Sequence, residues 1–527
     1  MRGDLEWGTV PRLVRSAAER FSDLDAVVDG DVRLTFSELA ELAEQATRGF
    51  IGSGVQPGDR VAIWAPNVHE WVVALLGLHG AGAVLVPLNT RFKGAEAAYI
   101  LGKSGARMAL TVTGFLGADY AGMLRDAGAG VPIVVLRGEP SEGTVGWDDF
   151  LQAGDSVDPA DARDRAAAVG PDDLSDVMFT SGTTGRPKGA MLTHGQTLRS
   201  FADWADVVGL RAGDRYLIVN PFFHSFGYKA GIVASLIAGA TIVPHAVFDP
   251  SSVLGRVTEE RITMLPGPPT LYQSILADPQ LADADITSLR LAVTGAAVIP
   301  VDLIHRMRGE LGFETVVTGY GLTECNGIAT MCRHDDDPET IATTSGRAIP
   351  GVEVLVAGDD GAEVERGLPG EVIVRGYNVM RAYFDEPEET AAAIDDGGWL
   401  HTGDIGVMDE RGYLRITDRK KDMFIVGGFN AYPAEVESLV LRNQKVAQVA
   451  VVGVPDERLG EVGMAFVVLR PGETATAAEL VEWCRAEMAN YKAPRYVEIV
   501  DALPLNASGK VLKFELRDLG RAALGQK

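Results

Sequence analysis

Cysteine is scarce in this chain of 527 residues, which contains Cys325, Cys332 and Cys484 and no others. An odd number of cysteines without metal-type spacing argues against a disulfide framework and against a cysteine-ligated zinc site, and it is typical of a reducing compartment. An export signal is also lacking, because the N-terminal stretch MRGDLEWGTVPRLV carries Asp4 and has no apolar core of signal-peptide length. We therefore expect the protein to stay in the cytoplasm.

Positive charge is under-represented as well. Lys and Arg number 48 against 73 Asp and Glu, which gives a formal charge of −25 at pH 7 and a pI near 4.8. Nucleic acids and anionic membranes are bound by basic surfaces, so this balance argues against both as partners. The remaining composition, with 46% hydrophobic and 23% charged residues, is that of an ordinary soluble globular protein.

One apolar run is long enough to span a bilayer by count, WVVALLGLHGAGAVLVPL at residues 71–88. Gly77, His79, Gly80 and Gly82 interrupt it, and they divide it into an apolar helix, a glycine turn and a short β-rich strand. The run therefore predicts a buried α/β unit, and we expect no integral membrane segment.

The order of apolar segments indicates an α/β protein. Short Val/Ile/Leu strands alternate with Ala/Leu-rich helical segments through most of residues 1–400. This alternation is typical of mainly parallel sheets flanked by helices. The length suggests about three domains at ~150 residues each, although one large α/β unit can absorb more than that.

A structural break is predicted in the charged run TDRKKDMF, residues 417–424, which follows a hairpin-like stretch. A new series of elements comes after it: a helix starting at Pro433, strands near residues 446–453 and 463–469, and a helix capped by Thr476. We predict a large N-terminal domain over residues 1–420 and a small α+β C-terminal domain over residues 421–527.

The stretch FTSGTTGRPKGAMLTHG, residues 179–195, is rich in Gly, Thr and Ser around one lysine. It differs from the phosphate loop of kinases and ATPases, which requires G-x-x-x-x-G-K-[ST]. Counting from Gly182, Pro187 stands where a glycine should precede the lysine, and Gly189 stands where a hydroxyl should follow it. Another kind of phosphate loop is therefore needed.

The flanking sequences SDVMFT and GAMLTH both predict strands. A capping box of Thr193 and Gln196 starts a helix only after the second strand, whereas a kinase-type loop opens directly into a helix. Phosphate would then be held by backbone N–H groups, hydroxyls and one ammonium group. These groups belong to Thr180, Ser181, Gly182, Thr183, Thr184, Gly185 and Lys188.

The loop TSGTTGRPKG resembles the phosphate loop of the adenylate-forming superfamily, which comprises acyl-CoA synthetases, carrier-loading adenylation domains and beetle luciferases. The resemblance continues along most of the chain in an ordered set of motifs. These are PFFHSFG (221–227), VTGAAVIP (293–300), YGLTE (320–324), GEVIVRG (370–376), WLHTGDIG (399–406), ITDRKKDMFIVGGFNAYPAEVE (416–437) and LPLNASGKVLK (503–513).

The resemblance implies a reaction of a carboxylic acid with ATP, for which positive charge must offset two anions. It implies that Glu324 holds Mg²⁺, with Thr323 and Thr184 nearby, and that Lys510 stabilises the charge that develops during adenylation. It places His224 at the mouth of the acyl pocket; a core histidine is the alternative.

Further residues of the nucleotide site are implied in the same way: Gly295, Ala296, Ala297, Tyr320, Gly321, Asp404 and Arg419. Small residues let the adenine ring lie close to the backbone, and Tyr320 offers it a stacking face. Asp404 resembles the carboxylate that binds the ribose hydroxyls, and Arg419 a second nucleotide contact.

In the CoA ligases of this superfamily the small domain rotates between two half-reactions. The resemblance makes Lys421 the pivot, and it makes Gly427 and Gly428 the face that admits coenzyme A. It thus implies ATP, Mg²⁺ and coenzyme A as cofactors and co-substrates, with a small carboxylic acid as the other partner. A homodimer is left open.

The substrate is open between two acid classes. Stretches around His224 and Glu324 are most similar to the bacterial ligases that act in steroid breakdown on a methyl-dioxo-octahydroindenyl propanoate, a bicyclic acid derived from the C and D rings. Medium- or long-chain fatty acids are the alternative, and a non-catalytic nucleotide-binding protein is a third hypothesis. Leu505 departs from the family, which usually has Arg there.

Overall fold

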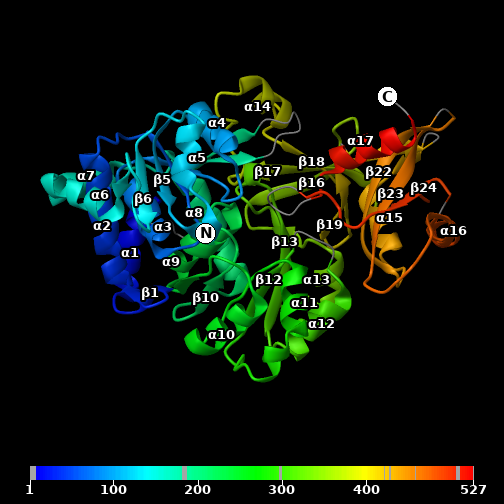
Figure 1. The fold of residues 1–527 in the computed structure, drawn as a ribbon, viewed down its shortest axis with the longest axis horizontal. Helices are drawn as coiled ribbons and strands as arrows, with labels where there is room; N and C mark the ends of the chain where they lie inside the picture. Colours follow the sequence, from blue (N-terminus) through cyan, green and yellow to red (C-terminus); the bar gives the residue numbers. More distant parts are fainter. Residues whose placement is uncertain are drawn as a thin grey trace. The chain divides into compact units, whose positions relative to one another are not determined.

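The computed structural model (Figure 1) describes the chain apart from residues 1–7, 181–186, 296–298, 420–421, 427–428, 457, 489, 506–510 and 526–527. Its contacts divide the chain into two units. The first comprises Met1–Val354 and Val374–Leu400, and the second comprises Leu355–Ile373 and His401–Lys527.

The largest sheet of the first unit has seven strands in the order β7-β6-β5-β3-β4-β8-β9. All neighbours are parallel except β8 and β9, which are antiparallel. The strands are β7 (Val145–Gly146), β6 (Ile133–Arg137), β5 (Ala106–Val112), β3 (Arg60–Trp64), β4 (Val84–Pro87), β8 (Leu174–Thr180) and β9 (Lys188–Thr193). Strand β4 is apolar and buried throughout, and so is β3 after Arg60 at its start, as expected for a parallel sheet covered on both faces.

A second sheet of this unit has the order β10-β11-β1-β2 and is parallel except for β2. Met264 bridges β10 to β12, which is parallel to β13, and β14 and β15 follow as short antiparallel strands. The strands are β10 (Arg215–Ile218), β11 (Thr241–Pro244), β1 (Asp25–Asp29), β2 (Val32–Thr35), β12 (Leu291–Thr294), β13 (Thr315–Tyr320), β14 (Thr330–Met331) and β15 (Arg347–Ala348).

Helices separate these strands along the chain, as the sequence predicts. The α-helices of the first unit are α1 (Val10–Phe21), α2 (Phe36–Gly52), α3 (His69–Gly80), α4 (Gly94–Ser104), α5 (Tyr120–Asp126), α6 (Trp147–Ala153), α7 (Pro159–Ala168), α8 (His194–Val208), α9 (Ala234–Ala238), α10 (Pro250–Glu260), α11 (Pro269–Ala277), α12 (Val301–Gly309), α13 (Pro338–Thr343) and α14 (Pro387–Ala393). Short 3₁₀ helices are η1 (Phe115–Gly117), η2 (Gly154–Ser156), η4 (Pro279–Ala282) and η5 (Thr323–Cys325), and η3 (Phe226–Val233) is a π-helix. The prediction of mainly parallel sheets with flanking helices is confirmed.

The apolar run at residues 71–88 forms the buried helix α3 and strand β4, as predicted. The helix extends further than the sequence predicts, because Gly77 and Gly80 lie inside α3 rather than in a turn. A Cβ atom at Gly77 would lie 2.4 Å from the Cβ of Ala46 on α2, so these glycines permit close packing of two helices. Within the described residues, no helix is long and apolar enough to cross a membrane.

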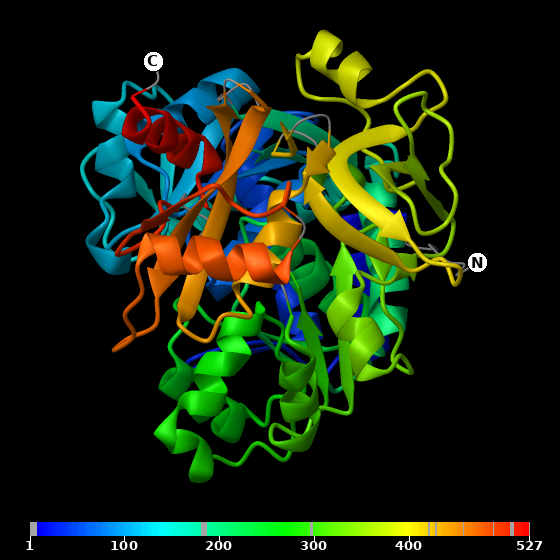
Figure 2. The same ribbon diagram turned by 90° about the vertical axis from the view of Figure 1, so that its right-hand side faces the viewer.

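The second unit contains a sheet with the order β21-β20-β23-β22, on which β24 pairs in parallel with β23 (Figure 2, orange strands). Its elements are β20 (Phe424–Val426), β21 (Phe429–Ala431), α15 (Pro433–Val440), β22 (Val446–Asp456), β23 (Gly460–Leu469), α16 (Ala477–Glu487), β24 (Tyr496–Ile499) and α17 (Lys513–Ala523). The predicted helix start at Pro433 and the capping box of Thr476 are both present. This unit has a hydrophobic core of its own, which includes Phe424, Val452 and Phe466. Its sheet and its helices make it an α+β unit, as predicted.

Four further strands form a sheet in chain order: β16 (Val352–Ala357), β17 (Pro369–Gly376), β18 (Leu400–Met408) and β19 (Leu414–Arg419). The limits of the two units at residues 354, 373 and 400 fall within these strands. The domain boundary predicted between residues 420 and 421 lies outside the described residues, and it stays a prediction.

Candidate active site

Strand β8 precedes the Gly/Thr-rich stretch and strand β9 follows it, so the prediction of a strand on each side is confirmed. Thr180 at the end of β8 is the antiparallel partner of Lys188 at the start of β9. The helix α8 begins only after β9, with Thr193 and Gln196 forming its capping box. Of the candidate residues, Ser181, Gly182, Thr183, Thr184, Gly185, Ala296, Ala297, Lys421, Gly427, Gly428 and Lys510 lie outside the described residues.

Glu324 lies in η5, just after β13, and its carboxylate meets the start of the loop. Its Oε1 atom accepts a hydrogen bond from the Thr180 hydroxyl at 3.2 Å and another from the Tyr383 hydroxyl at 2.9 Å. The Glu324 carbonyl accepts a hydrogen bond from the Met380 backbone at 2.7 Å, which fixes the turn. The fold thus brings Thr180 and Glu324 together, and it adds Tyr383, which the sequence did not indicate.

This group of oxygen atoms suits a hard cation. One carboxylate and two hydroxyls, from Glu324, Thr180 and Tyr383, converge at the start of the loop. Mg²⁺ prefers oxygen ligands and is commonly held by one or two carboxylates together with substrate phosphates. The residues present therefore fit a magnesium ion at Glu324.

Lys188 is nearly buried and forms an ion pair with Glu389 of α14. Its ammonium group also lies 5.3 Å from the centre of the Tyr383 ring. The segment 381–384 pairs with β9, since the Phe384 backbone N–H donates to the Gly189 carbonyl at 2.7 Å and the Met191 N–H to the Ala382 carbonyl at 3.0 Å. Segment 381–384 therefore pairs along the outer strand of the hairpin that carries the loop, and the sequence did not predict this pairing.

The nucleotide candidates Gly295 and Tyr320 occupy neighbouring strand ends. Gly295 follows β12, and Tyr320 ends β13, which is parallel to β12. In parallel α/β sheets, ligands bind at the carboxyl ends of the strands. Gly321 has a packing reason of its own, because a Cβ atom there would lie 2.5 Å from the Ile328 backbone.

Asp404 and Arg419 belong to the second unit, where they are partners across the antiparallel strands β18 and β19. Asp404 is buried, and its backbone N–H donates to the Thr402 hydroxyl at 3.1 Å. These two nucleotide candidates are thus neighbours in one antiparallel ladder.

His224 lies in the turn before η3 and keeps contact with solvent. Its Nδ1 atom accepts a hydrogen bond from the Phe226 backbone N–H at 3.3 Å. Because the side chain is exposed, it does not belong to the hydrophobic core.

A buried polar network lies beneath these segments and was missed at the sequence level. The Lys229 ammonium donates to Asp176 Oδ1 at 2.9 Å and to Asn326 Oδ1 at 2.6 Å, and all three side chains are fully buried. Asn326 Nδ2 donates in turn to the Ser200 hydroxyl at 3.1 Å. A lysine within the apolar stretch FGYKAGIV was the available signal, since a buried ammonium needs a partner.

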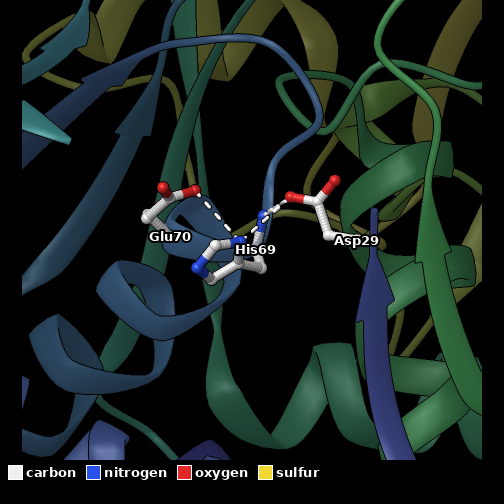
Figure 3. A group of neighbouring side chains, drawn as sticks. All are labelled: Asp29, His69 and Glu70. Atoms are coloured by element: carbon white, nitrogen blue, oxygen red, sulfur yellow. Dashed lines mark hydrogen bonds and ion pairs between the residues drawn. The ribbon is translucent and has the colours of Figure 1, made fainter. Parts of the chain in front are cut away.

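Asp29, His69 and Glu70 form a second group of potential metal ligands within the described residues (Figure 3). The Arg137 Nη2 atom lies 2.5 Å from Asp29 Oδ2, 2.6 Å from Glu70 Oε2 and 2.8 Å from His69 Nδ1. Burial alone would raise the pKa of Asp29, but hydrogen bonds from His69 and Arg137 hold it below its ordinary range. Because the guanidinium already occupies the centre of the group, this is an ion-pair cluster rather than a metal site.

Comparison with known proteins agrees with this geometry. The AMP-binding enzyme family matches residues 14–384, and the AMP-binding enzyme C-terminal domain matches residues 435–510. A 3-[(3aS,4S,7aS)-7a-methyl-1,5-dioxo-octahydro-1H-inden-4-yl]propanoyl:CoA ligase of Rhodococcus jostii is 51% identical over 97% of this chain and 98% of its own length. The ligase of the same name from Mycobacterium tuberculosis is also 51% identical, over 97% of this chain and 99% of its own.

A solved structure extends the similarity to the fold. The anthranilate CoA ligase AuaEII, in complex with anthranoyl-AMP, matches with a TM-score of 0.86 and 28% identity over 98% of both chains. The resemblance that the motifs suggested is confirmed over nearly the whole length. The chain belongs to the AMP-binding enzyme family.

Proposed function

We propose that this protein is an ATP-dependent carboxylic acid:CoA ligase that works through an acyl-AMP intermediate. The observation that carries the proposal is the hydrogen bond between Thr180 and Glu324 at the start of the Gly/Thr-rich loop. It joins two motifs that lie far apart in the sequence into one oxygen-rich group beside the nearly buried cation Lys188. Family membership and the CoA ligases among the relatives support the same reaction.

In the first half-reaction, a carboxylate oxygen of the acid attacks the α-phosphorus of ATP, and pyrophosphate leaves. Both reactants are anions, so the chain must supply positive charge and hydrogen-bond donors. The loop residues Thr180 to Gly185 would bind the phosphates, with Lys188 and Lys510 as cations. Mg²⁺ supplies further charge when bound, and Glu324, with Thr184 and Thr323 nearby, would hold it.

Lys188 is paired with Glu389 in this structure, so binding a phosphate requires the ammonium to exchange one anionic partner for another. The base and sugar of the nucleotide would lie against Gly295, Ala296, Ala297, Tyr320 and Gly321, with Asp404 and Arg419 as the polar contacts. His224 would lie at the entrance of the acyl pocket.

In the second half-reaction, the thiol of coenzyme A attacks the acyl carbon, and AMP leaves. We propose that Lys421 acts as the pivot between the half-reactions and that Gly427 and Gly428 admit the pantetheine arm. The domain boundary at residues 420 and 421 belongs to the same proposal.

The proposed acid is the bicyclic propanoate that the two ligases at 51% identity are named for. A fatty acid is the alternative, because a fatty acyl CoA synthetase of Mycobacterium tuberculosis is 33% identical with a TM-score of 0.77. We expect kcat/KM for the bicyclic acid to exceed that for fatty acids from octanoate to hexadecanoate by about tenfold or more, since a pocket shaped for a rigid bicycle leaves a flexible chain poorly packed. Higher values for any fatty acid would reverse the assignment.

The reaction itself is tested by two dependences. Pyrophosphate release should require both ATP and a carboxylic acid, and thioester formation should require coenzyme A in addition. If no acid in a broad panel supported pyrophosphate release, the proposal would be contradicted. Cytoplasmic location and a homodimer are further proposals, to be checked by cell fractionation and sedimentation equilibrium.

Replacing Glu324 by glutamine should raise the Mg²⁺ concentration needed for half-maximal pyrophosphate release, because a neutral amide is a weaker ligand for a hard cation. We expect an increase of about tenfold or more, the lower end of what loss of metal-site groups costs. Glu353→Gln is the matched control, since Glu353 is exposed and pairs with Arg375 at 2.9 Å on the surface. Equal Mg²⁺ dependence in both variants would contradict the assigned role.

A further inference from the structure

Tyr383 contacts both charged residues of the proposed phosphate site. Its hydroxyl donates to Glu324 Oε1 at 2.9 Å, and its ring centre lies 5.3 Å from the Lys188 ammonium. We propose that Tyr383 is a positioning residue for the divalent cation that accompanies ATP, and that it acts by fixing the carboxylate of Glu324. This inference rests on the proposed function and adds a residue that no motif indicated.

The hydrogen bond has one direction. A carboxylate can only accept, so the phenol must donate its proton. The ordinary pKa of a tyrosine phenol is about 10, so at neutral pH the hydroxyl carries the proton that it donates.

Two donors share one oxygen of Glu324. The hydroxyls of Thr180 and Tyr383 both reach Oε1, at 3.2 and 2.9 Å. Among the residues that the structure describes, none donates a hydrogen bond to Oε2. The carboxylate is thus held through one oxygen, while the other is available as a ligand. Carboxylates that bind metals are typically oriented by such hydrogen bonds.

The position of Tyr383 is itself fixed by the hairpin that carries the loop. Tyr383 bridges to Ala190 of β9, and its backbone N–H donates to the Thr390 hydroxyl at 2.9 Å. Thr390 belongs to α14, which also provides Glu389 for Lys188. One segment therefore sets the position of the carboxylate for the cation and of the ammonium for the phosphates.

The chain provides a matched control in Tyr377. Its hydroxyl donates to the Asp203 carboxylate at 2.7 Å. Asp203 lies on α8, and neither residue contacts Glu324 or Lys188 in the described structure. Removing either hydroxyl deletes one phenol-to-carboxylate hydrogen bond, but only Tyr383→Phe deletes one at the proposed cation site.

The test measures cation binding apart from turnover. Mn²⁺ binding to the full-length protein with the non-cleavable analogue α,β-methylene-ATP is followed by electron paramagnetic resonance. We expect Tyr383→Phe to weaken Mn²⁺ binding about 10–100-fold, the range found when groups that orient metal ligands are lost. We expect Tyr377→Phe to change it less than about twofold. Melting temperatures of the two variants report any general loss of stability.

A double variant shows whether Tyr383 acts through Glu324. In a Glu324→Gln background, adding Tyr383→Phe should weaken Mn²⁺ binding by less than about twofold, because the carboxylate it positions is gone. Full additivity, or equal effects of Tyr383→Phe and Tyr377→Phe, overturns the inference. Failure of the wild-type protein to release pyrophosphate with any acid would instead overturn the proposed function, while the Mn²⁺ measurements still decide the role of Tyr383.

Discussion

Replacing Lys229 by methionine should lower the free energy of unfolding by about 3–5 kcal/mol. Lys229 and Asp176 are both fully buried, and their charged atoms lie 2.9 Å apart. Burial lowers the pKa of Lys229, and the charge of Asp176 opposes that shift. Methionine has a similar volume, so the main loss is the cation, which leaves a buried carboxylate without its counter-charge. Urea unfolding followed by tryptophan fluorescence measures the effect, because Trp71 and Trp204 are buried in the same unit.

Lys103→Met is the matched control. The Lys103 ammonium lies 2.8 Å from Glu386, but that carboxylate is 36% exposed, so the pair is screened by water. We expect a loss of no more than about 1 kcal/mol for this variant. Adding Asp176→Asn to Lys229→Met should recover part of the larger loss, because neither position of the buried pair then carries a charge. Equal losses for the two lysines, or no recovery, would contradict the account.

The buried network also supports the site. Asn326 accepts from Lys229 and lies two residues after Glu324, with a left-handed φ of 63° that asparagine tolerates better than most residues. Asp176 lies on β8, four residues before Thr180, and Lys229 lies on the π-helix that follows His224. The buried network therefore joins the strand that leads into the loop, the segment proposed for the acyl pocket and the turn that carries Glu324.

Local features of the fold were predictable because they depend on neighbouring residues. The strands on both sides of the loop follow from apolar patterns, and the start of α8 follows from the pairing of Thr193 with Gln196. Gly77 shows the limit of this reasoning. Its role depends on contact with Ala46 of another helix, so it was assigned to a turn although it packs inside α3.

Contacts across the site could not be derived from spacing. Glu324 is 144 positions from Thr180 and 59 positions from Tyr383. The motif resemblance indicated Thr180 and Glu324, but nothing in RAYFDEPEET distinguishes Tyr383 from a surface aromatic. The network around Lys229 was missed in the sequence, and only the tertiary fold identifies Asp176, 53 positions earlier, as the partner of this lysine.

Replacing Lys510 by alanine should slow adenylation by about 10²–10³, the cost of removing one group that stabilises charge in a transition state. Lys510 lies outside the described residues, and the role proposed for it rests on the family resemblance of the motif NASGK. Its charge would act while the acid attacks the α-phosphorus, whereas the thiol attacks an acyl carbon that is already activated. Pyrophosphate release in a single turnover measures the first step, and thioester formation from preformed acyl-AMP measures the second.

Thioester formation from acyl-AMP should stay within a few-fold of the wild-type rate in Lys510→Ala, a loss of less than about 1 kcal/mol in that barrier. Lys513→Ala is the matched control, because Lys513 follows closely in the chain but pairs with Glu437 at 2.8 Å within the second unit. That variant loses a positive charge of the same kind, and we expect both half-reactions to change little and to the same extent. If Lys510→Ala slowed both half-reactions equally, Lys510 would not be a group specific to adenylation. The use of different faces of the C-terminal domain in the two steps would then lose its support.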